Sequence, residues 1–360
     1  MTTYLLAGGG TAGHVNPLLA VADGLRARGT GADVRVLGTA EGLESRLVPQ
    51  RGYELLVVDK VPFPRRPDRA AAAFPSRFRR AVAQVRAHIA THEVDVVVGF
   101  GGYASAPAYV AARRAGIPFV VHEANARPGL ANRLGARRAA GVGVAFEGTP
   151  LPRARLVGMP LRREIENLDR AALRAEAAAS FDLSPDAPTL LVFGGSLGAL
   201  RLNTAIAGSW RDVLDAGWQL LHVTGDRSDL EDPGVPGYAL RRYVDRMDLA
   251  FAACDFIVSR SGAATVSEIS ALGIPAVYVP YAVGNGEQAL NAASAVASAV
   301  AHGAAILIPD ADFTPETVRD RILPLLTDAD ERAGMAEKAA EIGIRTGTEN
   351  LIAMIDEALA

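Results

Sequence analysis

Residues 255–291 hold polar groups whose types and spacing indicate a specific chemistry. A short apolar run, Phe256–Val258, leads into the turn at residues 259–262, and residues 263–272 have the composition and spacing of a helix. The start of such a helix presents free backbone N–H groups and the positive end of its dipole, which together favour an anion. Glu268 follows closely, where a carboxylate can accept both hydroxyls of a ribose. The pattern favours a phosphate and a ribose bound side by side, although an ordinary strand–helix–strand unit with a surface glutamate has the same spacing.

The segment Gly284–Gln288 follows the next predicted strand, at the same edge of the sheet. It supplies an acid, Glu287, and an amide, Gln288, and both groups suit the hydroxyls of a sugar. Phosphate, ribose and sugar contacts in this order describe a nucleotide sugar.

Three glycine-rich segments each follow an apolar run, at residues 8–13, 101–107 and 194–199. The first satisfies the Gly-x-Gly-x-x-Gly fingerprint of dinucleotide-binding folds, which is a weak signal alone. A dehydrogenase would need an acid at the end of the second strand, and Glu41 keeps that alternative open. No Gly-Lys-Ser/Thr follows a glycine loop, so the Walker pattern is absent.

His14 is predicted to lie where the first helix begins, and a helix N-terminus disfavours the charged imidazole. A neutral imidazole at a ligand site can accept a proton from a sugar hydroxyl. The alternative is a histidine that only caps or packs. The segment His122–Asn125 follows the fifth predicted strand at the same edge and can add further polar contacts.

The segment from Lys60 to Arg80 carries seven basic residues against one acid, Asp68, with Phe63, Phe74 and Phe78 interleaved. A solvated loop and helix face is the usual explanation for such a run. Aromatic rings among arginines favour an anionic membrane surface, to which each basic residue near it contributes about 1 kcal/mol.

Composition excludes several classes of protein. With 360 residues, 49% hydrophobic and 21% charged, the chain is long enough for two domains with real cores. A net charge of −3 gives no general case for nucleic-acid binding. Cys254 is the single cysteine, which excludes an internal disulfide, and its apolar surroundings predict a buried, inert thiol.

The sequence shows no signal peptide and no uncharged apolar run long enough to span a membrane. Two Asp-x-Asp pairs, at 310–312 and 328–330, are interpreted as helix caps and not as metal ligands.

Apolar runs alternate with helical stretches along the whole chain, which predicts α/β domains with parallel, doubly wound sheets. Each half opens with a strand that runs into a glycine loop, so two Rossmann-like domains facing a cleft are expected, with a boundary near residues 156–160. A first helix is predicted from Pro17 to Arg28. The predicted strands are 4–7, 34–37, 55–58, 94–98, 119–121, 142–145, 189–193, 220–223, 256–258, 276–279 and 305–308.

Seven ordered motifs between Leu5 and Asn291 resemble one known family. They are GGGTAGHVNPLLA, GFGGYASAP, HEANARPGLANR, GMPLR, GGSLGA, RSGAATVSE and GNGEQALNA. Together they resemble the MurG family, the bacterial N-acetylglucosaminyltransferases that make lipid II for peptidoglycan. The resemblance implies a two-domain glycosyltransferase B fold and an inverting hexosyltransferase without a metal or other cofactor. Its substrates would be UDP-GlcNAc and the MurNAc 4-hydroxyl of lipid I.

The resemblance also implies a domain plan and a location. Residues 1–157 would form the domain that faces the acceptor and the membrane, residues 158–345 the donor domain, and residues 346–360 a final helix packing back on the first domain. The enzyme would be held peripherally at the cytoplasmic face of the cell membrane through Lys60–Arg80. Other cell-wall synthesis proteins would be its partners, and nucleic acid would not.

Site residues carried over by motif have the following implied roles. His14 is the favoured base, and the acceptor side includes Gly102, Tyr103 and Glu123. Val244 would hold the uracil through its backbone, and Glu268 the ribose. The other implied substrate contacts are Thr11, Ala12, Gly13, Asn125, Arg162, Ser196, Ala263, Ala264, Thr265, Val266, Ser267 and Gln288.

Three positions depart from the family pattern: Leu197 replaces a usual Gln, Leu200 a frequent Arg, and Met159 a frequent Asn. The first two remove polar groups near a phosphate loop, so donor affinity and acceptor identity are open. The alternatives are a paralogue that glycosylates another lipid-linked or natural-product acceptor, a UDP-GlcNAc 2-epimerase, and an inactive UDP-sugar sensor.

Overall fold

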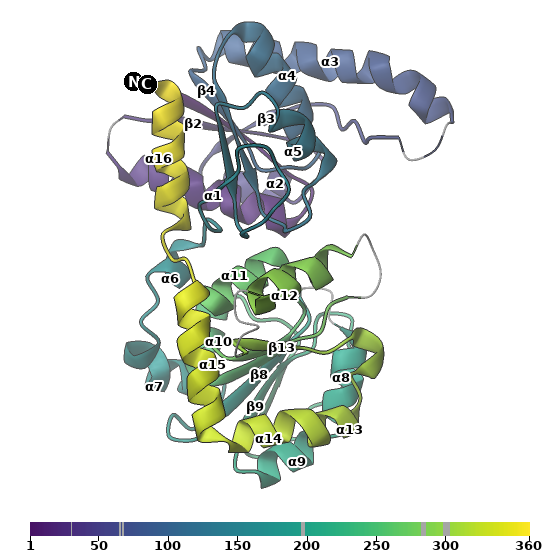
Figure 1. Cartoon of the computed structure of the whole chain (residues 1–360), viewed down its shortest axis with the longest axis vertical. Helices are drawn as coiled ribbons and strands as arrows, with labels where there is room; N and C mark the ends of the chain where they lie inside the picture. The colour runs from purple at the N-terminus through teal and green to yellow at the C-terminus, as the bar shows by residue number, and fades with distance from the viewer. Residues whose placement is uncertain (30, 65, 67, 196–198, 282–285, 298–302) are drawn as a thin grey trace. The chain divides into compact units, whose positions relative to one another are not determined.

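The computed structural model describes residues 1–29, 31–64, 66, 68–195, 199–281, 286–297 and 303–360, the side chains of 294–297 excepted. The chain forms two compact units, which are described separately: Met1–Arg162 with Ile344–Ala360, and Arg163–Gly343. Each unit has one parallel sheet covered by helices on both faces (Figure 1). The prediction of two doubly wound α/β domains is confirmed.

The first unit contains a seven-stranded sheet in the order β3-β2-β1-β4-β5-β6-β7. Its strands are β1 (Thr3–Ala7), β2 (Asp33–Gly38), β3 (Glu54–Val57), β4 (Val96–Gly99), β5 (Phe119–Glu123), β6 (Gly141–Val144) and β7 (Arg155–Leu156). Its helices are α1 (Ala12–Ala27), α2 (Glu44–Gln50), α3 (Arg69–Thr91), α4 (Ser105–Ala115), α5 (Leu130–Gly135) and α16 (Gly347–Leu359).

The second unit contains a six-stranded sheet in the order β10-β9-β8-β11-β12-β13. Its strands are β8 (Thr189–Phe193), β9 (Gln219–Val223), β10 (Tyr238–Arg241), β11 (Phe256–Ser259), β12 (Ala276–Tyr278) and β13 (Ala305–Leu307). Its helices are α6 (Arg163–Glu166), α7 (Arg170–Ser180), α8 (Leu200–Ala207), α9 (Trp210–Asp215), α10 (Met247–Ala253), α11 (Ala263–Ala271), α12 (Glu287–Ala297), α13 (Pro315–Thr317), α14 (Leu323–Thr327) and α15 (Ala329–Ile342), with η1 (Asp310–Asp312) and η2 (Val318–Ile322).

Both sheets are wound outward from their first strand, so each has one point where the strand order reverses. In the first sheet this point lies between β1 and β4, and Ala7 pairs with Gly99. In the second it lies between β8 and β11, and Phe193 pairs with Ser259. Ligands of open α/β sheets bind beside such a reversal, at the carboxyl ends of the strands. The fold therefore brings the first two glycine loops together in the first unit, and in the second unit it places the start of the third glycine loop beside the turn at residues 259–262.

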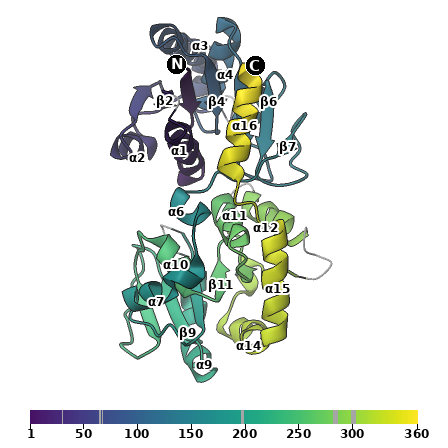
Figure 2. The ribbon, with the colours of Figure 1, turned by 90° about the vertical axis from the view of Figure 1, so that its left-hand side faces the viewer.

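Alternating side chains of β1 build the two cores of the first unit. Leu5 and Ala7 pack toward α3 and α4, whereas Tyr4 and Leu6 pack toward α1 and α16, because successive strand residues face opposite sides of a sheet. Figures 1 and 2 show α16, at the yellow end of the chain, lying beside this sheet. Its apolar face, with Leu351 and Ile355, is fully buried there, so the end of the chain completes the first core.

Helix α1 begins five residues earlier than predicted, at Ala12 instead of Pro17. Glycine and histidine in its first turn are weak helix formers, so the sequence pattern did not reveal the start. Thr11 is the cap residue but makes no side-chain cap bond. The difference matters because it places His14 inside the first turn of the helix.

Cys254 is fully buried, as predicted, and burial raises the pKa of its thiol to about 12. Asp328 caps α15 by accepting from the Glu331 N–H at 2.9 Å, which confirms one predicted cap. The prediction of a helix cap at residues 310–312 was wrong, because the side chain of Asp310 forms ion pairs with Arg260 and Arg201 instead of capping a helix. Within the described residues, no helix is both long and apolar enough to span a bilayer.

Candidate active site

The two glycine loops of the first unit touch each other at the strand-order reversal. A side chain at Gly102, whose φ is +80°, would collide with the backbone of Gly9. The hydroxyl oxygen of Ser105 lies 2.9 Å from the Ala7 carbonyl oxygen and accepts from the Gly101 N–H at 3.0 Å. The second loop is therefore fixed against the end of β1, and glycine is required where the two backbones meet.

His14 is half-buried between these two loops. Its Nδ1 lies 3.1 Å from the Gly9 carbonyl oxygen and 3.2 Å from the Thr11 hydroxyl. A carbonyl oxygen can only accept, so the contact with Gly9 favours the neutral tautomer that has its proton on Nδ1 and its lone pair on Nε2. A Cβ on Gly101 would lie 2.9 Å from Nε2, which shows how closely the ring lies against the second loop. This is the form of histidine that a general base requires.

Glu44 is a buried acid that the sequence analysis missed. It is 1% exposed, and its carboxylate accepts from the Gly10 N–H at 2.7 Å and from both the N–H and the hydroxyl of Thr39. Burial raises the pKa of this carboxyl, but the bonds from Gly10 and Thr39 outweigh it and the net shift is downward. Glu41, the acid considered from sequence, is exposed and pairs with Lys60 at 3.3 Å. The only sequence signal for Glu44 was an acid at a helix start amid glycines.

Glu123 holds the loop that follows β5. Its buried carboxylate accepts from the N–H groups of Asn125 and Gly129, each at 2.9 Å, and from the side chain of Asn132 at 2.9 Å. Tyr109 donates to the same Asn132 at 2.7 Å, which fixes the amide in turn. The arrangement gives Glu123 a structural task and presents Asn125 on an ordered loop.

The basic segment has its aromatic rings turned toward the core. Phe63, Phe74 and Phe78 are half-buried, and each ring contacts the next, with ring centroids 5.4 and 5.5 Å apart. The described arginines of the segment are exposed, while Arg65 lies outside the described residues. The fully buried residues of α3 all lie at or beyond Ala81, and Figure 1 shows the first half of the helix extending past the sheet. Lys60 lies over the ring of Tyr103, 5.5 Å from its centroid.

In the second unit, the turn before α11 is tied to the start of α12. Ser261 donates its hydroxyl proton to the Gln288 carbonyl oxygen at 2.9 Å, and the Gln288 side-chain oxygen accepts from the Tyr281 N–H at 2.9 Å. Along α11, Ala263 and Val266 are buried, whereas the half-buried positions are Ala264, Thr265, Ser267 and Glu268. Helix α11 therefore presents Thr265, Ser267 and Glu268 on its less buried side.

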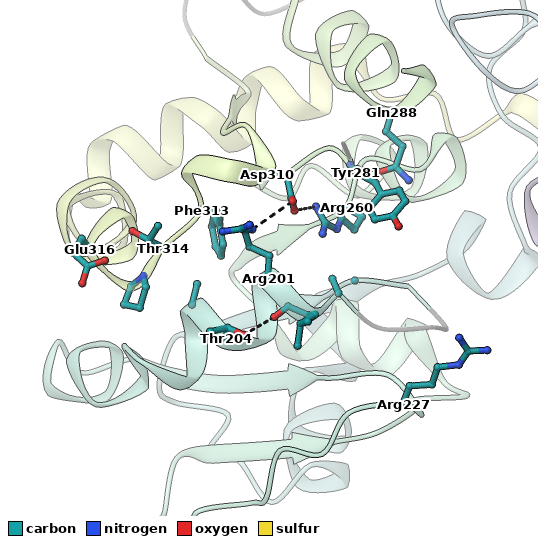
Figure 3. Close-up of a pocket in the computed structure, with 15 residues that line it drawn as sticks. Arg201, Thr204, Arg227, Arg260, Tyr281, Gln288, Asp310, Phe313, Thr314 and Glu316 are labelled. Carbon is teal, nitrogen blue, oxygen red and sulfur yellow. Dashed lines mark hydrogen bonds and ion pairs between the residues drawn. The ribbon is translucent and has the colours of Figure 1, made fainter. Parts of the chain in front are cut away.

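A cavity of about 950 Å³ opens at the carboxyl edge of the second sheet (Figure 3). It brings Gln288 together with Gly194 and Ala199 of the third glycine loop. Arg260 and Asp310 also line it, joined by an ion pair of 2.6 Å. Ser196, Leu197, Gly284 and Asn285, all singled out from sequence, lie outside the described residues.

The remaining predicted residues and departures lie as follows. Val244, in the segment between β10 and α10, and Arg162, at the end of the first unit, are half-buried. Leu200 begins α8 and is 83% exposed at the rim of the cavity, where a longer polar side chain would also fit. Met159 is 2% exposed, so at this position the usual polar group is replaced by a buried thioether.

Comparison with known proteins identifies the family. Residues 4–144 match the model described as the glycosyltransferase family 28 N-terminal domain, and residues 189–351 match its C-terminal domain. The chain belongs to glycosyltransferase family 28. Within this family it groups with the MurG proteins, as the sequence motifs predicted.

Named relatives match over the whole chain. A protein of Leifsonia xyli is 59% identical over 100% of this chain and 99% of its own length. One from Clavibacter michiganensis is 59% identical over 100% and 97%. Both are called UDP-N-acetylglucosamine–N-acetylmuramyl-(pentapeptide) pyrophosphoryl-undecaprenol N-acetylglucosamine transferase. The crystal structure of Acinetobacter baumannii MurG superposes with a TM-score of 0.81 at 28% identity, covering 99% of each chain.

Proposed function

We propose that this protein transfers GlcNAc from UDP-GlcNAc to the MurNAc 4-hydroxyl of lipid I, giving lipid II for peptidoglycan. The observation that carries the proposal is the 59% identity, over the full chain, to a relative named for this transfer. The three positions that depart from the family pattern lie within this full-length match. The match therefore favours lipid I as the acceptor over the different acceptor of a paralogue.

The first unit would supply the acceptor side of the reaction. His14 Nε2 would take the proton of the attacking hydroxyl as the oxygen bonds to the anomeric carbon of GlcNAc. The hydroxyl attacks the face opposite the diphosphate, and the bond from that carbon to the diphosphate breaks as the new bond forms. Its electron pair goes to UDP, and attack from the opposite face inverts the configuration. The loops carrying Thr11–Gly13 and Gly102–Tyr103 would face the acceptor diphosphate, and Asn125 the transferred sugar.

The second unit would hold the donor. The start of α11, from Ala263, and Ser196 of the third loop would stabilise the negative charge that UDP gains, without a metal. Glu268 would accept from the ribose hydroxyls, and the backbone of Val244 would hold the uracil. Arg162 would contact the nucleotide and Gln288 the GlcNAc hydroxyls. A chelator is expected to leave the rate unchanged.

Membrane binding would rest chiefly on charge. The exposed arginines of the segment Lys60–Arg80 would face the anionic cytoplasmic surface of the cell membrane, where lipid I is held. The half-buried phenylalanines would support that face from beneath. Contacts with other cell-wall synthesis proteins stay a prediction.

The decisive experiment measures UDP release from UDP-GlcNAc with and without a lipid I analogue. Release and a new disaccharide product that require the analogue are expected. Turnover of UDP-GlcNAc without any acceptor would instead indicate the 2-epimerase, and transfer only to unrelated acceptors a paralogue. No release under any condition, with UDP still bound, would indicate a sensor.

A further inference from the structure

The carboxylate of Glu44 and the imidazole of His14 hold opposite ends of one peptide group. Glu44 accepts from the N–H of Gly10 at 2.7 Å, and His14 Nδ1 lies 3.1 Å from the carbonyl oxygen of Gly9. That N–H and that C=O belong to the same amide, which is planar and points its two polar groups in opposite directions. A fixed negative charge is therefore linked to the histidine through a single peptide plane.

The surroundings of Glu44 are shaped for this contact. A Cβ placed on Gly9, Gly38 or Gly42 would collide with the Glu44 side chain, so three glycines make room for it. The same carboxylate is held on its other side by Thr39. It is thus enclosed and satisfied by hydrogen bonds in one orientation.

The link has an electrostatic consequence. A charged acceptor on the N–H polarises the amide, which makes its carbonyl oxygen a stronger acceptor for the Nδ1 proton. This favours the Nδ1–H form of the neutral ring and stabilises the imidazolium that forms when Nε2 takes a second proton. A carboxylate bonded directly to a histidine acts in the same way in catalytic triads.

We propose that Glu44 is a positioning residue that holds His14 in its Nδ1–H form through the Gly9–Gly10 peptide. Glu44 touches no substrate and acts through the loop. Its importance for the rate rests on the proposed transfer reaction, whereas its effect on the tautomer of His14 does not.

The test uses the full chain labelled with 15N in its histidines. Long-range 1H–15N spectra distinguish the two neutral tautomers, and the signals missing in His14→Gln assign this residue. The wild type should show Nδ1–H, and Glu44→Gln should show a mixture or mainly Nε2–H. Glu41→Gln, which removes an exposed charge three residues earlier, is the matched control and should match the wild type. An Nε2–H wild type, or an unchanged tautomer in Glu44→Gln, overturns the proposal.

Two further measurements cover the remaining outcomes. If Glu44→Gln does not fold, the chemical shift of the Gly10 amide proton of the wild type is followed with pH. This signal should move as Glu44 titrates, and a constant chemical shift overturns the link.

For folded enzyme, Glu44→Gln should lower kcat about 10- to 100-fold with donor KM unchanged, and move the acid limb of the kcat profile to lower pH. An unshifted acid limb overturns the proposal. A tautomer change in protein that transfers no GlcNAc would refute the proposed function alone.

Discussion

Arg260 Nη1 lies 2.6 Å from Asp310 Oδ1 at the carboxyl edge of the second sheet. The arginine is 8% exposed and lies in the turn that precedes α11. It also donates to the Val279 carbonyl oxygen at 3.0 Å. The pair thus ties the ends of β11, β12 and β13 together beneath the cavity. Its geometry leads to the first prediction.

Asp310→Ala should lower the free energy of unfolding by about 3 kcal/mol, because it leaves a buried guanidinium without its counter-charge. Urea denaturation measures the change. Asp212→Ala is the control, since its pair with Arg319 at 2.7 Å is exposed on both sides and should contribute about 0–1 kcal/mol. Equal losses of unfolding free energy in the two variants would show that the buried ion pair stabilises the fold no more than the exposed one.

The sequence predicted the parts of the fold that depend on local patterns. Buried apolar runs followed by glycines located the strands beside both reversals, as in β1 and β8. It missed β7, whose two residues are exposed, and β10, an edge strand whose apolar run is only Tyr238–Leu240. Edge strands carry weaker hydrophobic signals than central ones.

The candidate site was less accessible to sequence reasoning, since its contacts join distant positions. Glu44 bonds to Gly10 across 34 residues, and no local spacing reveals that contact. Asp310 followed the pattern of a helix cap, but its partner Arg260 is remote in sequence. Glycine loops and His14 were found because their chemistry lies within one short segment.

His14→Ala should lower kcat about 10²- to 10⁴-fold while donor KM changes little, because a general base acts on the acceptor proton and not on UDP-GlcNAc. Steady-state kinetics with a lipid I analogue separate the two constants. His92→Ala, at the C-terminal end of α3, serves as the control and should retain the wild-type rate. A rate preserved in His14→Ala would remove this residue from the mechanism.

Glu268→Ala should raise the donor KM about 10- to 100-fold, since a hydrogen bond to a charged group contributes about 1.5–3 kcal/mol. Calorimetric titration of UDP checks the same loss without catalysis. Glu337→Ala, an exposed glutamate of α15, should bind UDP like the wild type. Unchanged UDP affinity in Glu268→Ala would exclude the ribose contact.

Arg79→Ala with Arg80→Ala should weaken binding to vesicles rich in anionic lipid about 30-fold, at about 1 kcal/mol for each exposed arginine. Co-sedimentation at low and high salt measures the loss, which should shrink as salt screens the charges. Arg211→Ala with Arg321→Ala removes the same charge from exposed positions of the second unit. If both pairs weaken binding equally, the effect reflects net charge and not this segment.

Stability should fall as the pH drops from about 6.5 to about 4, because two histidines are buried as neutral rings. Burial lowers the pKa of both His122 and His222 to about 4, from an ordinary value of 6.5. In that window the unfolded chain binds protons that the folded chain does not. Each histidine therefore lowers the free energy of unfolding by about 1.4 kcal/mol for each unit by which the pH falls. His122→Gln keeps a donor for the Gly158 carbonyl oxygen, which now accepts from His122 at 3.0 Å, and should reduce the slope by one histidine's share. His92→Gln should leave the slope unchanged, and an equal slope in His122→Gln would mean that burial of this ring does not govern the acid limb of stability.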